Sequence, residues 1–144
     1  GLSIDGFGRS CDYSRTGSNW EETCEVVEQW VELANNNSNI NVYISTTISP
    51  LTVHDYSRLK KYAKKLGIDV NPYVVHQPSY MKLEALPSKY VKKITDENNK
   101  QFLDNVVFDP KLFEKFKKFI ATTDVAQKID IRNYLPKLAK YLDK

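Results

Sequence analysis

Apolar and polar positions in the first half of the chain follow a strand period and a helical period in turn. Residues 2–4 form a short strand-like stretch. Apolar side chains then recur at helical spacing over residues 20–34, and Ser18 with Glu21 forms the pattern of a capping box, so an amphipathic helix is predicted there. Residues 40–47 (INVYISTT) are β-branched and aromatic with alternating apolar positions, which predicts a second strand.

A second helix and a third strand continue this alternation. The helix is predicted over residues 54–66, and Gly67 stands where a glycine commonly ends a helix. Residues 68–75 (IDVNPYVV) predict a strand that Pro72 interrupts. Strands that alternate with helices through short connections are typical of right-handed βαβ units, so the sequence predicts a parallel sheet.

The second half of the chain has a helical pattern. One helix is predicted over residues 86–98, and Asp109 with Pro110 forms an N-cap and first-turn pair for another. A last helix is predicted over residues 123–141, where Pro136 would bend or restart it. These segments therefore predict a set of helices that follows the sheet.

The change of pattern divides the chain into an α/β part, residues 1–77, and a helical part, residues 78–144. With 144 residues, of which 41% are hydrophobic, the chain is long enough to bury a core. The net charge of +3 is small, and most lysines fall on predicted helices, which is typical of a solvated face. A nucleic-acid partner is therefore not expected, although a basic nucleic-acid or protein interaction domain stays open as an alternative.

The length of the apolar runs and the numbers of cysteines and histidines bear on whether the protein spans a membrane, forms disulfides or binds a metal. No apolar run approaches the roughly 18–20 residues that cross a bilayer, so no membrane partner is expected. Cys11 and Cys24 are too few for a disulfide framework, which favours a reduced, cytoplasmic protein. His54 and His76 are the only histidines and lack the spacing of a metal site, so no metal is expected on this chain.

The polar residues after the first strand are the strongest candidates for chemistry. The stretch SIDGFGRSCDYSRTGSNW (residues 3–20) places Asp5 and Gly6 directly after the strand, which is typical of a turn. From the residues alone, Ser3 could be a strand hydroxyl bonded to neighbouring backbone. Arg15 could likewise be a surface arginine that caps a turn.

This stretch resembles the middle of radical SAM enzymes, in particular their twitch- or SPASM-type branch. In that branch the fourth barrel strand reads roughly Ser-Ile/Leu-Asp-Gly, and a short loop and Tyr-x-Arg-x-Gly-x-x-Trp follow it. The matching residues, with their spacing kept, are Ser3, Asp5, Gly6, Tyr13, Arg15, Gly17, Ser18 and Trp20. The resemblance implies an α/β fold in which parallel strands form the C-terminal half of a partial, incomplete TIM-type barrel, followed by a helical segment.

The resemblance also implies roles for residues near the ends of the strands. Ser3 would reach the ribose of S-adenosylmethionine and Arg15 its carboxylate, while Asp5 would organise the loop that presents Arg15. Both placements suit a parallel barrel, which binds ligands at the carboxyl ends of its strands, and a guanidinium, which forms two hydrogen bonds to a carboxylate. Where the family commonly has an asparagine, this chain carries Thr52, which puts the role of that position in doubt.

Three residues on the second and third strands, and one directly after the third strand, complete the expected site. Thr47 would face the cofactor, and Val74 would pack against its adenine. Tyr73 and His76 would lie on the side of the substrate. Because strand alternation decides which side chains point inward, these assignments depend on a register that the sequence does not fix.

The family's iron–sulfur chemistry needs residues that this chain does not carry. Radical SAM enzymes bind a 4Fe–4S cluster through a Cys-x-x-x-Cys-x-x-Cys loop, and Cys11 and Cys24 do not match that spacing. The cluster ligands are therefore expected upstream, in an N-terminal remainder of the same polypeptide. The implied function is the C-terminal portion of an enzyme that cleaves S-adenosylmethionine reductively and acts on an unknown substrate, a peptide being one candidate. A non-catalytic α/β binding module is the alternative.

Overall fold

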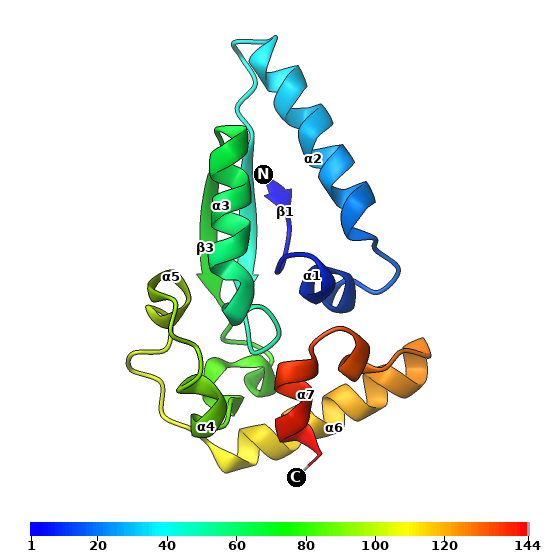
Figure 1. Cartoon of the computed structure of the whole chain (residues 1–144), viewed down its shortest axis with the longest axis vertical. Coiled ribbons are helices and arrows are strands. Elements are labelled where there is room, and N and C mark those ends of the chain that lie inside the picture. The colour runs from blue at the N-terminus through cyan, green and yellow to red at the C-terminus, as the bar shows by residue number, and fades with distance from the viewer. Residues whose placement is uncertain (144) are drawn as a thin grey trace.

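The computed structural model describes residues 1–143, which form a mixed α/β fold around a small parallel sheet (Figure 1). The sheet has the order β1 (Leu2–Ser3), β2 (Tyr43–Ile48) and β3 (Asp69–Val74), and both pairs of strands are parallel. This confirms the parallel sheet that the alternating pattern predicts. Over the described residues the sheet stays open and does not close into a barrel.

Two helices cover one face of this sheet. They are α2 (Trp20–Asn35) and α3 (Tyr56–Leu66), which follow β1 and β2 along the chain. Their apolar sides share a buried cluster with the strands, made up of Ile4, Cys11, Val27, Val31, Ile44, Leu59 and Ala63. Because both crossover helices lie on the same side, the opposite face of the sheet is left to polar side chains.

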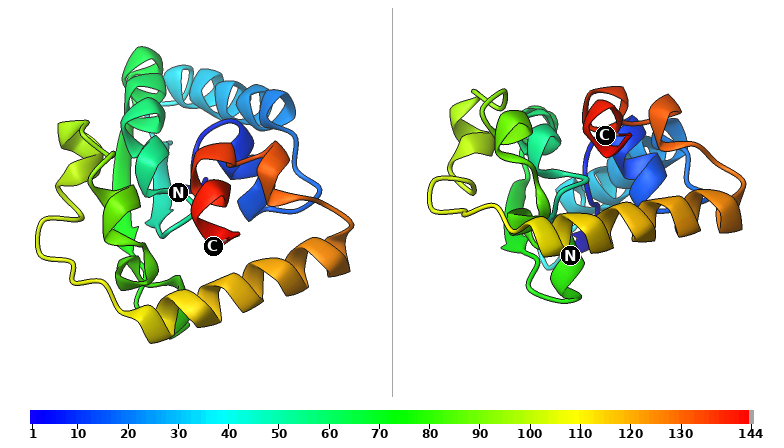
Figure 2. Two further views of the ribbon diagram at one scale, coloured as in Figure 1. Left: turned by 60° about the horizontal axis from the view of Figure 1, so that its bottom comes forward. Right: turned by 90° about the horizontal axis from the view of Figure 1, so that it is seen from below.

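The helical part lies beyond the carboxyl ends of the strands (Figure 1). Its α-helices are α4 (Ser88–Val91), α5 (Glu97–Lys100), α6 (Pro110–Gln127) and α7 (Pro136–Leu142). The described residues also form four 3₁₀ turns, at Val53–Asp55, Ser79–Met81, Leu83–Ala85 and Ile131–Asn133. Seen from below, α6 runs across the end of the molecule (Figure 2). No helix within residues 1–143 is long and apolar enough to cross a membrane.

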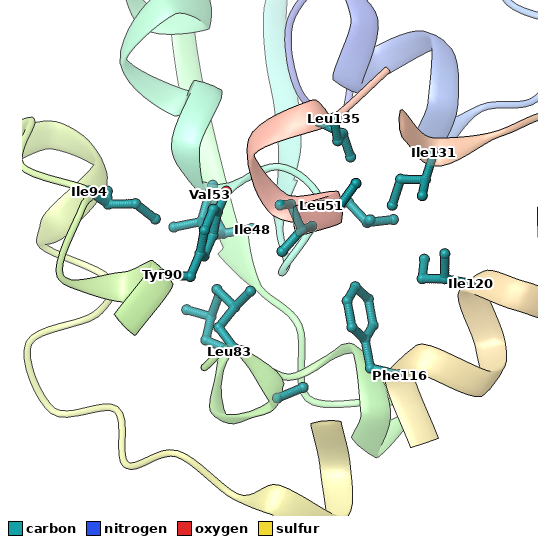
Figure 3. Close-up of a cluster of buried hydrophobic side chains, with 14 of the residues drawn as sticks. Ile48, Leu51, Val53, Leu83, Tyr90, Ile94, Phe116, Ile120, Ile131 and Leu135 are labelled. Carbon is teal, nitrogen blue, oxygen red and sulfur yellow. The ribbon is translucent and has the colours of Figure 1, made fainter. Parts of the chain in front are cut away.

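A single buried cluster joins the sheet to the helical part (Figure 3). Ile48 and Val53 enter it from β2 and the turn that follows, and Leu83 and Phe116 enter it from the helical part. Phe116 and Val53 have no exposed surface. The boundary expected at residue 77 therefore runs through a shared apolar core.

The local structure departs from the sequence prediction after β1. Residues expected to form only a polar loop include a short helix, α1 (Arg9–Ser14), which buries Ser10, Cys11 and Tyr13. Gly8 precedes it without a capping side chain, so the sequence carries no start signal for this helix. The expected capping box at Ser18 is also wrong, because the side chain of Asn19 caps α2 instead.

Two predicted helices are interrupted. The helix expected over residues 86–98 is the two short helices α4 and α5, because Asp96 caps a new start. The helix expected over residues 123–141 is the end of α6, a turn and α7, and Pro136 begins the last of these. Val125, near the end of α6, is 82% exposed. The other signals hold, since Gly67 ends α3 in the left-handed conformation and Asp109 caps α6.

Truncation of Phe116 tests whether the core makes one folding unit. We expect Phe116→Ala to lower the free energy of unfolding by about 3–5 kcal/mol, because a fully buried aromatic ring leaves a cavity. Phe113→Ala, at a partly buried position of the same helix, should cost less than half as much. Urea unfolding followed by tryptophan fluorescence measures this, because Trp20 and Trp30 both lie on α2, in the α/β part. An unchanged fluorescence transition would show that the two parts unfold independently.

Candidate functional site

The face of the sheet opposite α2 and α3 carries a row of polar side chains. Ser3 pairs with Ser45, and Ser45 pairs with Asn71. One step further along, Thr47 pairs with Tyr73. Residues in register on parallel strands point to the same face, and residues two apart on one strand do so too. The five side chains therefore form one polar surface, on which Asn71 and Tyr73 are exposed.

A cavity of about 250 Å³ lies at the carboxyl end of this surface. The loops after all three strands contribute to it, through Asp5 after β1, Thr52 after β2 and Gln77 after β3. Thr47 lines it from β2, and Phe119 of α6 lines it from the helical part. This is the edge of a parallel sheet where ligands commonly bind.

Asp5 holds the loop after β1 against β2. The backbone N–H of Thr47 donates a hydrogen bond to Asp5 Oδ1 at 2.8 Å. Arg15 Nη2 lies 3.6 Å from Asp5 Oδ2, and the Arg15 side chain is 46% exposed. A guanidinium has five N–H donors, so this pair leaves Arg15 with donors for a ligand. The structure thus brings Asp5, Arg15 and Thr47 together at the carboxyl ends of β1 and β2.

Thr52 closes the loop that follows β2. Its hydroxyl donates to the Thr47 carbonyl at 2.7 Å and accepts from the Ser49 N–H at 3.0 Å. The residue is buried and lines the cavity. Its hydroxyl is therefore engaged in the loop that supports Thr47.

The structure does not bring two of the expected site residues to the polar surface. Val74 is in register with Ile48, which is buried in the apolar core on the other side of the strand. His76 is exposed, whereas its neighbours Val75 and Gln77 line the cavity. Of the expected site residues on these strands, Thr47 of β2 and Tyr73 of β3 lie on the polar surface.

A buried carboxylate anchors the loop that carries the site. Asp55 accepts a hydrogen bond from Ser10 Oγ at 2.6 Å and one from Arg58 Nη1 at 3.1 Å. His54 Nε2 lies 3.4 Å from Asp55 Oδ2, the same oxygen that accepts from Ser10. Burial on its own would raise the pKa of Asp55, but the interactions with His54, Ser10 and Arg58 together lower it below its usual value. Sequence reasoning missed this centre, for which the Asp–Arg spacing of three residues is the only local signal.

Helix α1 is also fixed to the helical part. Tyr13 Oη donates to Asp124 Oδ1 at 2.7 Å, and the other oxygen of Asp124 accepts from the Ile131 N–H at 3.0 Å. Burial and then the bond to Asp124 raise the pKa of Tyr13, so the phenol stays protonated. Arg9 donates to the Asn133 carbonyl at 2.9 Å. The loop between β1 and α2 is therefore held from both sides.

The described residues do not fit an iron–sulfur cluster. Within residues 1–143 no group of three or more cysteine, histidine or acidic side chains could hold a metal ion. Cys11 is buried, and burial raises the pKa of its thiol to about 11, which disfavours the thiolate that a metal needs.

Comparisons with models of protein families, with curated proteins and with solved structures give no match to this chain. The features of this chain that bear on function are the polar surface, the cavity and the Asp5–Arg15 pair. Their common feature is a position at the carboxyl ends of parallel strands.

The Asp55 centre predicts a specific loss of stability in acid. Because the pKa of Asp55 is lowered by folding, its contribution is complete above the unfolded value of about 4 and is lost as the pH falls through the folded value. Asp55→Asn should lower the free energy of unfolding by about 3 kcal/mol at neutral pH. In this variant the free energy of unfolding should also fall less between about pH 5 and pH 3 than it does in the wild-type chain. Urea unfolding at a series of pH values measures both effects.

Asp130→Asn is the matched control for this variant. Asp130 also has a lowered pKa through its bond to Arg132, but it is open to solvent, which screens the interaction. The control should change stability little at any pH. Equal effects of the two substitutions would contradict a special role for the buried carboxylate.

Proposed function

We propose that this chain is the S-adenosylmethionine-binding, C-terminal portion of a radical SAM enzyme. The observation that carries the proposal is the Asp5–Arg15 pair, which lies beside a cavity at the carboxyl end of a parallel sheet. The resemblance of residues 3–20 to that family supplies the identity of the cofactor. The sheet geometry supports it, because Ser3 and Thr47 lie on one polar face and Asp5 accepts a hydrogen bond from the backbone of Thr47.

Each residue of the pair has a distinct part in this proposal. Arg15 binds the carboxylate of the cofactor, because a guanidinium stays charged and forms paired hydrogen bonds to carboxylates. Asp5 positions Arg15 through their ion pair. Because Asp5 also accepts a hydrogen bond from the Thr47 N–H, it holds Arg15 at a fixed distance from β2. Asp5 is thus a positioning residue, and Arg15 touches the ligand.

Hydroxyl groups of the polar surface bind the nucleoside part. Ser3 is exposed on the face that it shares with Ser45, and its hydroxyl can donate to and accept from a ribose. Thr47 lies next along the same face and lines the cavity. Tyr73, 60% exposed on the neighbouring strand, is placed to contact a substrate, for which a peptide is the candidate.

The proposed whole enzyme is a partial TIM-type barrel. Three parallel strands with crossover helices on one face are the repeating unit of such a barrel, and the polar surface would then face its interior. The N-terminal remainder of the same polypeptide supplies the cysteine ligands of the 4Fe–4S cluster. Residues 1–143 contribute the binding and orientation of the cofactor.

Removal of the guanidinium tests the proposal. We expect the chain to bind S-adenosylmethionine in isothermal titration calorimetry, and Arg15→Ala to weaken binding by about tenfold or more, because a charge-assisted contact is lost. The control is Arg132→Ala, since Arg132 is another exposed arginine paired with an aspartate. It should leave the affinity unchanged.

A second ligand separates carboxylate binding from general damage. 5′-Methylthioadenosine keeps the nucleoside but has no carboxylate, so Arg15→Ala should leave its affinity unchanged. Ser3→Ala should weaken both ligands by about three- to tenfold, the value of one hydrogen bond. The proposal is wrong if neither ligand binds the wild-type chain, or if Arg15→Ala weakens both equally.

A further inference from the structure

The two helices that cover the sheet carry opposite charges. Helix α2 contains five glutamates and neither lysine nor arginine. Helix α3 contains four lysines and Arg58 and no acidic residue. Because these charges cancel, the small net charge of the whole chain does not reveal them. The outer side of this helix pair is therefore acidic on one helix and basic on the other.

The glutamates of α2 form an acidic stripe on the side of the helix next to α3. The stripe consists of Glu21, Glu25, Glu28 and Glu32, whose spacing of four, three and four residues places them on one side of the helix. All four are exposed. Glu28 identifies the side, because Tyr62 Oη of α3 donates a hydrogen bond to Glu28 Oε1 at 3.4 Å. The acidic stripe therefore borders the seam between the two helices.

Lysines of α3 form a basic stripe on the other side of this seam. Lys61 and Lys65 are four residues apart, and Lys65 follows Tyr62 by three residues, so both lie on the side of the helix next to α2. Both are exposed. Within residues 1–143 no ion pair involves these two lysines or the glutamates of the acidic stripe. Carboxylates and ammonium groups without ion-pair partners thus lie in two neighbouring rows.

A second copy of this chain is the partner that fits this pattern. Helices α2 and α3 both run from the carboxyl ends of the strands back toward their amino ends, so they point the same way (Figure 1). Rotation by 180° about an axis along the seam places the acidic stripe of each copy over the basic stripe of the other. We propose that α2 and α3 form the interface of a two-fold symmetric dimer with this arrangement.

Charge excludes the other occupants of this face. A two-fold axis across the helices would place α2 over α2 and α3 over α3, so like charges would meet. A nucleic acid would reach the basic stripe only beside a row of carboxylates, which repel its phosphates. The proposed dimer does not rest on the proposed function, because it uses neither the cavity nor the Asp5–Arg15 pair. The two are compatible, since crossover helices form the outer ring of a barrel.

Reversal of charge in pairs tests the dimer. One variant, Glu25→Lys with Glu32→Lys, makes the acidic stripe basic. The other, Lys61→Glu with Lys65→Glu, makes the basic stripe acidic. Each alone should raise the dimer dissociation constant about tenfold or more in about 50 mM salt, because like charges then face each other. Sedimentation velocity of the 144-residue chain measures the dissociation constant, and circular dichroism checks that each variant keeps its helices.

An equimolar mixture of the two variants should form dimers with the affinity of the wild-type chain. In the mixed dimer the reversed stripes face each other, and so do the unchanged stripes, so opposite charges meet at both contacts. Lys111→Glu with Lys115→Glu is the matched control, because these exposed lysines have the same spacing on α6. The control should leave the dissociation constant unchanged.

Salt supplies an independent measurement. Exposed charges are screened, so the wild-type dissociation constant should rise about tenfold or more between about 50 mM and about 500 mM salt. The proposal is overturned if the wild-type chain stays monomeric at low salt, if it forms assemblies larger than a dimer, or if salt has no effect. It is equally overturned if the mixture of variants stays monomeric or if the control variant weakens the dimer as much as they do.

Discussion

The buried carboxylate of Asp55 is the contact on which the site's geometry depends. It lies at the start of the helix after β2, yet its hydrogen bond from Ser10 holds the loop after β1. That loop carries Asp5 and Arg15. The carboxylate of Asp55, in the connection between β2 and β3, therefore helps to hold Asp5 and Arg15, in the connection between β1 and β2. A buried charge of this kind tolerates no missing partner, and Ser10 and Arg58 supply the partners from two directions. The loop is therefore ordered without a long helix or a disulfide.

The parallel register then separates apolar from polar chemistry. Alternation sends Ile44 and Ile48 of β2 toward the buried clusters, and it sends Ser45 and Thr47 to the opposite face. Because both crossover helices pack on the apolar side, they leave the polar side uncovered. The cavity at its carboxyl end is completed by α6, so the helical part closes a site that the strands begin.

Local patterns predicted the elements well and their long-range contacts poorly. The strands, the glycine that ends α3 and the Asp109 cap follow from period and capping, which act within a few residues. Helix α1 has six residues and no side-chain cap, so contacts with Asp55 and Asp124 stabilise it instead of its own sequence. The Asp5–Thr47 bond spans 42 residues and depends on register. For the same reason the side of Val74 could not be read from the sequence.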